Sequence, residues 1–121
     1  MLLHTNHFLS PRFTGRDVGL WVMPDSPFRL ERIGAAVAGD GPLSLDMFRL
    51  ALADHANFPS GVCCHPDTRF APVDQGTTVA SVLMDLDDRT MWVADGHPCT
   101  APYRRLDYAA FLSKPASVAA G

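Results

Sequence analysis

The clearest pattern of hydrophobic and polar positions lies within residues 41–56 and has a helical spacing. Leu45, Phe48 and Leu52 fall three or four positions apart, which places them on one face of an α-helix. Ser44 stands directly before this stripe, where its hydroxyl can accept a hydrogen bond from an unpaired N–H of the first turn. We therefore predict a helix that begins after Ser44 and buries its apolar face.

A second helical pattern covers residues 25–39, but its apolar stripe is less regular and Gly34 weakens it. Ser26 is placed to cap this helix. Pro27 suits the first helical position, because the N–H that proline lacks would be unpaired there anyway. Gly39 suits the end. These signals predict a helix between Ser26 and Gly39.

The second half of the chain has strand patterns instead. Residues 77–86 form a long run of strand-favouring side chains, residues 87–89 suit a turn, and residues 90–95 return as an antiparallel partner. Residues 103–112 fit either a last strand or a short helix. Because two helices precede an antiparallel sheet, we predict an α+β fold with helices on one face of the sheet.

Two shorter segments also have the features of strands. Residues 2–8 alternate, with Leu3, Thr5 and His7 on one face. A strand that begins at the first methionine would take its partners from earlier sequence, so we expect this chain to start in the middle of a fold. Residues 60–65 likewise suit a short strand, whereas prolines and glycines between residues 10 and 24 predict irregular structure.

Composition and charge restrict the classes of function. The 121 residues are 47% hydrophobic and 19% charged, which is typical of a globular domain. The net charge is −3 and the basic residues are scattered, so we predict no nucleic-acid binding. No apolar run approaches the roughly 20 residues that span a bilayer, so we predict no membrane insertion. Three cysteines without a secretory leader favour free thiols and a cytoplasmic location.

The segment GVCCHPD, residues 61–67, is the first candidate for chemistry. A metal site would use His55, Cys63, Cys64 and His65, but adjacent residues of a strand point to opposite faces, so the two cysteines do not readily share an ion. We therefore predict no metal site. Cys63 is interpreted as a buried packing residue. Cys64 fits either a buried thiol or a nucleophile with a histidine base, and the sequence leaves both open.

The polar segment HTNH, residues 4–7, is the second candidate. Four polar groups in an expected strand destabilise it unless each finds a partner. The amide NH₂ of Asn6 can donate a hydrogen bond to an oxyanion, as side chains of oxyanion holes do. By contrast, Cys99 in DGHPC is interpreted as a lone thiol in a turn.

Four segments together resemble segments of one known family, in the same order. They read HTNHFL, PDSPFRLERI, LADHANFPSGVCCHPD and TTVASVLMDLDDRTMWVADGHPC. The series is similar to the C-terminal part of the acyl-coenzyme A:6-aminopenicillanic acid acyltransferase family. That family includes isopenicillin N acyltransferase and belongs to the N-terminal nucleophile superfamily. The resemblance covers about residues 2–103.

The resemblance implies both a fold and a reaction. Members fold as a four-layer αββα sandwich, so residues 1–112 would form the C-terminal half of such a sandwich and residues 113–121 a disordered tail. Members cut themselves before a cysteine, whose thiol becomes the nucleophile and whose α-amine becomes the base. They act on small-molecule amides or acyl-coenzyme A thioesters, without a metal or a fixed cofactor. Asn6 matches the asparagine implied to donate to the oxyanion.

Two departures from the family change the expected function. The family's nucleophilic cysteine precedes the HTNH segment, whereas the three cysteines here match other places, so we expect this chain alone to lack the nucleophile. Cys64 also replaces a family arginine that could bind a substrate carboxylate. We therefore expect part of an acyltransferase or linear-amide hydrolase that is inactive alone. The alternative is a non-catalytic subunit or binding protein that completes a partner chain. An uncovered apolar surface would then favour dimerisation or poor solubility.

Overall fold

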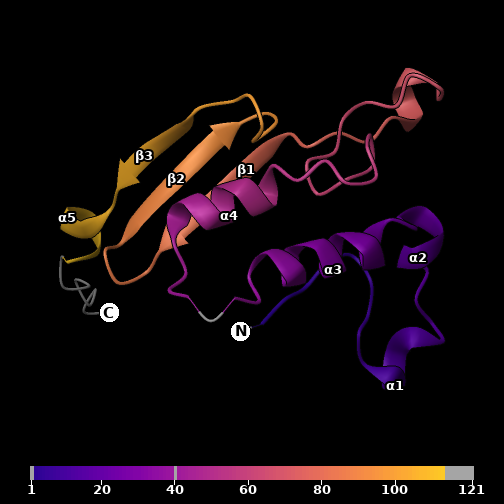
Figure 1. Cartoon of the computed structure of the whole chain (residues 1–121), viewed down its shortest axis with the longest axis horizontal. Coiled ribbons are helices and arrows are strands. Elements are labelled where there is room, and N and C mark those ends of the chain that lie inside the picture. The colour runs from indigo at the N-terminus through magenta and orange to yellow at the C-terminus, as the bar shows by residue number, and fades with distance from the viewer. Residues whose placement is uncertain (1, 40, 114–121) are drawn as a thin grey trace, which may run out of the picture.

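The computed structural model describes residues 2–39 and 41–113 and has an α+β architecture, as predicted (Figure 1). Its elements in chain order are α1 (Pro11–Thr14), α2 (Gly19–Val22), α3 (Ser26–Ala36), α4 (Leu45–Leu52), the 3₁₀ turn η1 (Pro72–Asp74), β1 (Ala80–Asp85), β2 (Thr90–Asp95), β3 (Tyr103–Asp107) and α5 (Ala109–Leu112). The three strands form one antiparallel sheet in the order β1-β2-β3. The predicted succession of helices and then antiparallel strands is therefore confirmed.

The β1–β2 hairpin follows the strand pattern of the sequence. It pairs from Ala80 opposite Asp95 to Asp85 opposite Thr90. The predicted first strand, residues 77–86, is too long because ladder pairing with β2 begins only at Ala80. Residues 103–112, for which the sequence left two possibilities, contain both elements, since β3 is followed by α5.

Helix α4 begins where the sequence places it. The hydroxyl of Ser44 accepts a hydrogen bond from the backbone N–H of Met47 at 3.2 Å, so the predicted cap is confirmed. The helix ends at Leu52, because the chain turns away at Ala53. The long periodic pattern therefore overestimates the length of the helix but gives its start correctly.

The predicted cap of α3 is wrong. Ser26 is the first helical residue, Asp25 occupies the N-cap position, and no side chain caps the helix. The reason is that residues 23–26 already turn, with the N–H of Ser26 donating to the carbonyl of Met23 at 3.1 Å. The helix also ends at Ala36, before the glycine predicted to end it.

Three further expectations need correction. Residues 2–8 form no strand with the described part of the chain, although Leu3, Thr5 and His7 are half-buried and the intervening side chains are exposed. Residues 60–65 form bends with one isolated bridge between Ser60 and Cys64, because the segment folds back on itself. The stretch predicted to be irregular, residues 10–24, contains α1 and α2.

The core lies where α4 packs between α3 and the sheet (Figure 1). Helix α4 contacts β1 on the face that carries the buried side chains of Leu83 and Ala94. The described residues bury few large side chains: the buried hydrophobic residues are Val37, Ala51, Cys63, Leu83 and Ala94. Such a small core gives limited hydrophobic stabilisation.

The opposite face of the sheet is also apolar. Val82 pairs with Val93 and Met84 with Met91, so these four side chains share one face. Val82 and Met84 are 45% and 65% exposed. The sheet therefore has two apolar faces, and these residues of the second face remain in contact with solvent.

Within the described part of the chain, no helix combines the length and hydrophobicity needed to cross a membrane. Of the predicted tail at 113–121, Ser113 ends α5, and residues 114–121 lie outside the described residues.

Candidate functional site

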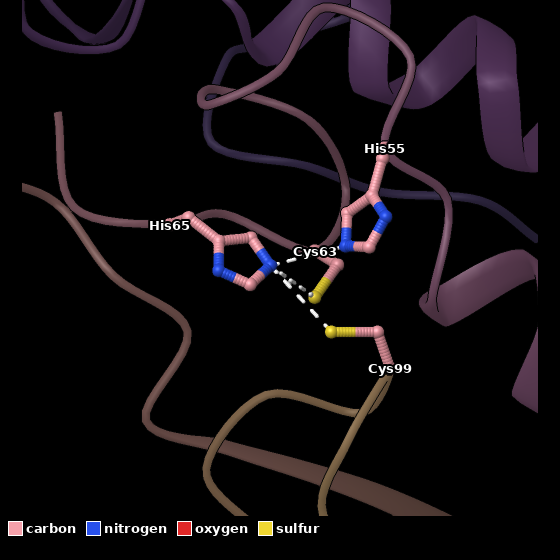
Figure 2. A group of neighbouring side chains, drawn as sticks. All are labelled: His55, Cys63, His65 and Cys99. Atoms are coloured by element: carbon pink, nitrogen blue, oxygen red, sulfur yellow. Dashed lines mark hydrogen bonds between the residues drawn. The ribbon is translucent and has the colours of Figure 1, made fainter.

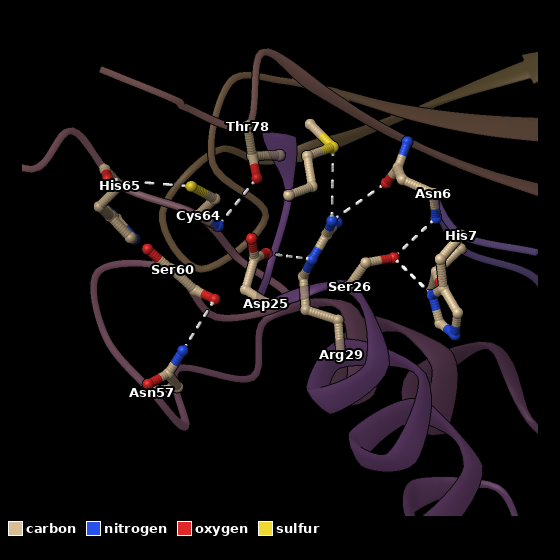
Figure 3. A network of polar contacts seen from close by, with 12 residues as sticks. Asn6, His7, Asp25, Ser26, Arg29, Asn57, Ser60, Cys64, His65 and Thr78 are labelled. Atoms are coloured by element: carbon tan, nitrogen blue, oxygen red, sulfur yellow. Dashed lines mark hydrogen bonds and ion pairs between the residues drawn. The ribbon is translucent and has the colours of Figure 1, made fainter. Parts of the chain in front are cut away.

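The backbone around Asn6 is fixed by a buried serine at the start of α3. The N–H of Asn6 donates to Oγ of Ser26 at 2.9 Å, and Nδ1 of His7 lies 2.9 Å from the same oxygen (Figure 3). Ser26 is fully buried. The hydroxyl of Ser26, which the sequence predicted to cap a helix, therefore holds the HTNH segment in place instead.

The side chain of Asn6 has a defined orientation. Nη2 of Arg29 donates to Oδ1 of Asn6 at 3.0 Å, and Nε of Arg29 lies 2.6 Å from Oδ2 of Asp25 in an ion pair. A guanidinium group only donates hydrogen bonds, so the atom facing it must be the amide oxygen. The NH₂ group of Asn6 consequently points away from Arg29 (Figure 3), and Asn6 is exposed.

A small cavity adjoins this amide. Residues 4–8 line a volume of about 320 Å³. The start of α2 also approaches Asn6 so closely that a Cβ at Gly19 would lie against the carbonyl oxygen of Asn6, which only glycine avoids. Asn6 thus combines an oriented NH₂ group with a place in the lining of this cavity.

The second candidate site is built by the loop that follows α4. The N–H of Cys63 donates to the carbonyl of Asp54 at 3.0 Å, and the N–H of His65 donates to the carbonyl of Pro59 at 2.8 Å. Cys64 exchanges hydrogen bonds with Thr78, whose N–H donates to the Cys64 carbonyl and whose Oγ1 accepts from the Cys64 N–H, both at 2.9 Å. The backbone groups of Cys63 and Cys64 thus have different partners.

This loop and the connection between β2 and β3 bring four potential ligand atoms together (Figure 2). One atom from each of His55, Cys63, His65 and Cys99 lies within 4.8 Å of every other. We call this set the His/Cys cluster. Nε2 of His65 lies 3.0 Å from Nε2 of His55 and 3.5 Å from each of the Sγ atoms of Cys63 and Cys99. The interpretation of Cys99 as a lone thiol is therefore wrong.

The electrostatics of the cluster reflect its partial burial. Burial raises the pKa of the Cys63 thiol to about 11. Burial, with the neighbouring rings of His97 and His55, lowers the pKa of His65. His97 stacks on His65 with ring centroids 4.0 Å apart, while its Nε2 lies 2.8 Å from Oγ1 of Thr77. At neutral pH without an ion, the cluster therefore holds a protonated thiol and an uncharged imidazole.

Cys64 points elsewhere, toward a separate cavity of about 500 Å³. Its Sγ contacts the carbonyl oxygen of His65 at 3.9 Å, and no imidazole nitrogen of the described residues lies within hydrogen-bonding distance of it. Burial and the carboxylate of Asp25 raise the pKa of its thiol. Of the two interpretations left open by the sequence, this geometry favours the partly buried, protonated thiol over the nucleophile.

The sequence prediction missed Cys99 as a member of the cluster because Cys99 lies far along the chain and reaches the loop only through the β2–β3 connection. One local signal points to part of the cluster. In an extended segment, residues two positions apart share a side, so the spacing of Cys63 and His65 already places both on one side. The four metal ligands considered from the sequence included Cys64, whereas the His/Cys cluster contains Cys99 instead.

Comparison with known proteins adds no assignment. No protein-family model matches the chain, and the curated proteins give no match. The resemblance to the acyltransferase family therefore rests on the ordered sequence segments alone.

Proposed function

We propose that this chain is the C-terminal part of an N-terminal-cysteine acyltransferase or linear-amide hydrolase. In this proposal the chain supplies the oxyanion donor and half of the fold, and another segment supplies the nucleophilic cysteine. The substrate class is a small-molecule amide or an acyl-coenzyme A thioester, handled without a metal or fixed cofactor in the reaction, in the reducing cytoplasm.

The orientation of Asn6 carries the proposal. Arg29 holds the amide oxygen and Ser26 holds the backbone, so the NH₂ group is preset before any substrate arrives. A donor that is already oriented stabilises a developing oxyanion without the cost of reorganisation, and one such donor contributes about 10²–10³ in kcat. An asparagine on a freely rotating exposed side chain would not have this property.

The two apolar faces of the sheet support the sandwich. In an αββα fold, helices cover one face of each sheet and the second sheet covers the other. Here α4 packs on the face of Leu83, while Val82 and Met84 of the opposite face are solvent-exposed. A second sheet packed against them would bury this surface, which stabilises the assembly by roughly 25 cal/mol per Å² of apolar area.

The cysteines of this chain support an external nucleophile. Cys63 and Cys99 belong to the His/Cys cluster, and Cys64 lines a cavity different from the one that Asn6 lines. An amide carbonyl bound at Asn6 therefore needs a thiol from another segment to attack it.

The test compares the purified 121-residue chain with the assembly recovered from its native cells through a tag on this chain. Both are assayed with acyl-amino acids and with a penicillin nucleus plus acyl-coenzyme A. We expect turnover only by the assembly. In the assembly, Asn6→Asp should lower kcat by about 10²–10³, because the carboxylate still accepts from Arg29 but offers no donor to the oxyanion.

A matched control is Leu50→Ala, since Leu50 is exposed on α4 and outside the site. Turnover by the purified chain alone would exclude an external nucleophile. Full kcat in the folded Asn6→Asp assembly would exclude the oxyanion role of Asn6. Recovery of an assembly without any N-terminal cysteine would favour the non-catalytic subunit instead.

A further inference from the structure

In the His/Cys cluster, Nε2 of His65 has more polar neighbours than one nitrogen atom can hydrogen-bond. Nε2 of His65 lies within 3.0–3.5 Å of three polar atoms, from His55, Cys63 and Cys99. An imidazole nitrogen carries either one proton or one lone pair, so it makes one good hydrogen bond. Three groups that converge on one nitrogen in a partly buried place therefore need another explanation for their positions.

Three of the six distances among these atoms, those from Nε2 of His65, are close to the edges of a tetrahedron around a single ion. With zinc–sulfur and zinc–nitrogen bonds of about 2.3 and 2.05 Å, a tetrahedral site has S···N edges of about 3.5 Å and N···N edges of about 3.3 Å. The two S···N distances to His65 are both 3.5 Å, and the N···N distance from His55 to His65 is 3.0 Å. All four atoms lie within 4.8 Å of one another, and because tetrahedral edges are about 3.3–3.8 Å, the more distant side chains must move closer when an ion binds.

The rings and thiols also point inward from separate pieces of backbone (Figure 2). Asp54 positions His55, since its carboxylate accepts from the N–H of Ala56 at 2.9 Å and forms an ion pair with Arg32. Cys99 lies in a turn in which the N–H of Ala101 donates to the carbonyl of His97 at 2.8 Å. The cluster is therefore held by two independent, hydrogen-bonded segments.

We propose that His55, Cys63, His65 and Cys99 bind one Zn²⁺ ion in a closed Cys₂His₂ site. Two thiolates and two imidazoles are the ligand set that tetrahedral zinc favours. Binding releases the two thiol protons to solvent, and the resulting site is electrically neutral, because two thiolate charges balance the charge of the ion. A neutral site suits a cluster in which Cys63 is fully buried.

The function of this ion is structural. All four positions of the tetrahedron are filled by protein, which leaves none for a substrate. The ion joins the loop at residues 54–65 to the turn at residues 97–101, which connects β2 to β3. Because the described residues bury few hydrophobic side chains, such a cross-link adds stability that the core alone lacks.

The first experiment measures metal in the full 121-residue chain, purified under reducing conditions without added chelator. We expect one zinc per chain by elemental analysis. Replacing it with Co²⁺ alone should give the intense visible bands of tetrahedral cobalt with thiolate ligands. EDTA should lower the midpoint of thermal unfolding, and added Zn²⁺ should restore it.

The second experiment uses variants that separate ligands from neighbours. His55→Ala removes an exposed ring, so it tests a ligand without opening the core. It and Cys99→Ser should weaken Co²⁺ binding by more than about 100-fold, since even loss of a group that only supports a ligand costs 10–100-fold. Cys64→Ser is the matched control, because this neighbouring thiol points away from the cluster. The affinity of this variant for Co²⁺ should be unchanged.

Three results would overturn the zinc site. The first is absence of both zinc and tetrahedral cobalt bands in folded protein. The second is equal weakening of Co²⁺ binding by Cys64→Ser and Cys99→Ser. The third is a Cys63–Cys99 disulfide in protein isolated from cells with its thiols protected against oxidation during lysis. None of these results depends on acyl transfer or amide hydrolysis.

Discussion

At the scale of single residues, Gly61 shows how closely the loop at residues 54–65 is packed. A Cβ built at Gly61 would lie 2.9 Å from the carbonyl oxygen of Ala56 and 3.0 Å from that of Asp54. Both oxygens belong to backbone, which cannot rotate away as a side chain can. The backbone on either side of His55 therefore depends on the absence of a side chain at this position.

We predict that Gly61→Ala lowers the free energy of unfolding by about 1–3 kcal/mol, the usual cost of extra volume in a packed place. Urea denaturation followed by circular dichroism measures this difference. Gly15→Ala is the matched control, because nothing lies within 4 Å of a Cβ at Gly15, and it should change stability by less than about 0.5 kcal/mol. Equal stability of the two variants would show that the loop is not closely packed in solution.

Residue chemistry also explains what the sequence could indicate about the sites. The donor role of Asn6 is inferred from its type and from a family resemblance, but its orientation depends on Arg29 and Ser26, about twenty residues away. Cys99 belongs to the cluster only because the turn between β2 and β3 brings it next to the loop at residues 54–65. Local spacing indicates which side of a segment a residue takes, whereas contacts between distant segments require the tertiary fold.

At the scale of elements, the local signals that acted through hydrogen bonds within one element were reliable. Ser44 caps α4 because its neighbours place its hydroxyl beside the N–H of Met47. The hairpin of β1 and β2 follows from alternation and a turn. The signals failed where tertiary contacts took the polar group, as with Ser26, or where a segment folded onto itself, as at residues 60–65.

The cap of α4 gives a prediction at this scale. Ser44→Ala should lower the free energy of unfolding by about 1 kcal/mol, because the N–H of Met47 loses its acceptor. Ser10→Ala is the control: Ser10 occupies the same N-cap position of α1 in extended conformation but makes no capping hydrogen bond. Chemical denaturation of both variants measures the difference, and a loss at Ser10 as large as that at Ser44 would contradict the capping role.

At the scale of the whole molecule, the uncovered apolar face of the sheet is the main feature to explain. Val82 and Met84 are exposed on it, and Val93 and Met91 lie beside them across the β1–β2 ladder. The face of Leu83 is covered by α4. A sheet with two apolar faces normally has a layer on each, because contiguous exposed apolar surface favours association.

We therefore predict that the purified chain self-associates through this face. Met84→Lys should weaken the association by at least about tenfold, equal to about 1.4 kcal/mol, because an ammonium group buried without a partner costs at least that much. Sedimentation velocity over a range of concentrations measures the dissociation constant. The same substitution at Leu50, which is 76% exposed on α4, is the control and should leave the constant unchanged. If the purified chain stays monomeric at all concentrations, or if Leu50→Lys acts as strongly as Met84→Lys, the uncovered face does not bind another layer. If Met84→Lys alone yields a stable monomer, the same face becomes the expected contact for the segment that completes the enzyme.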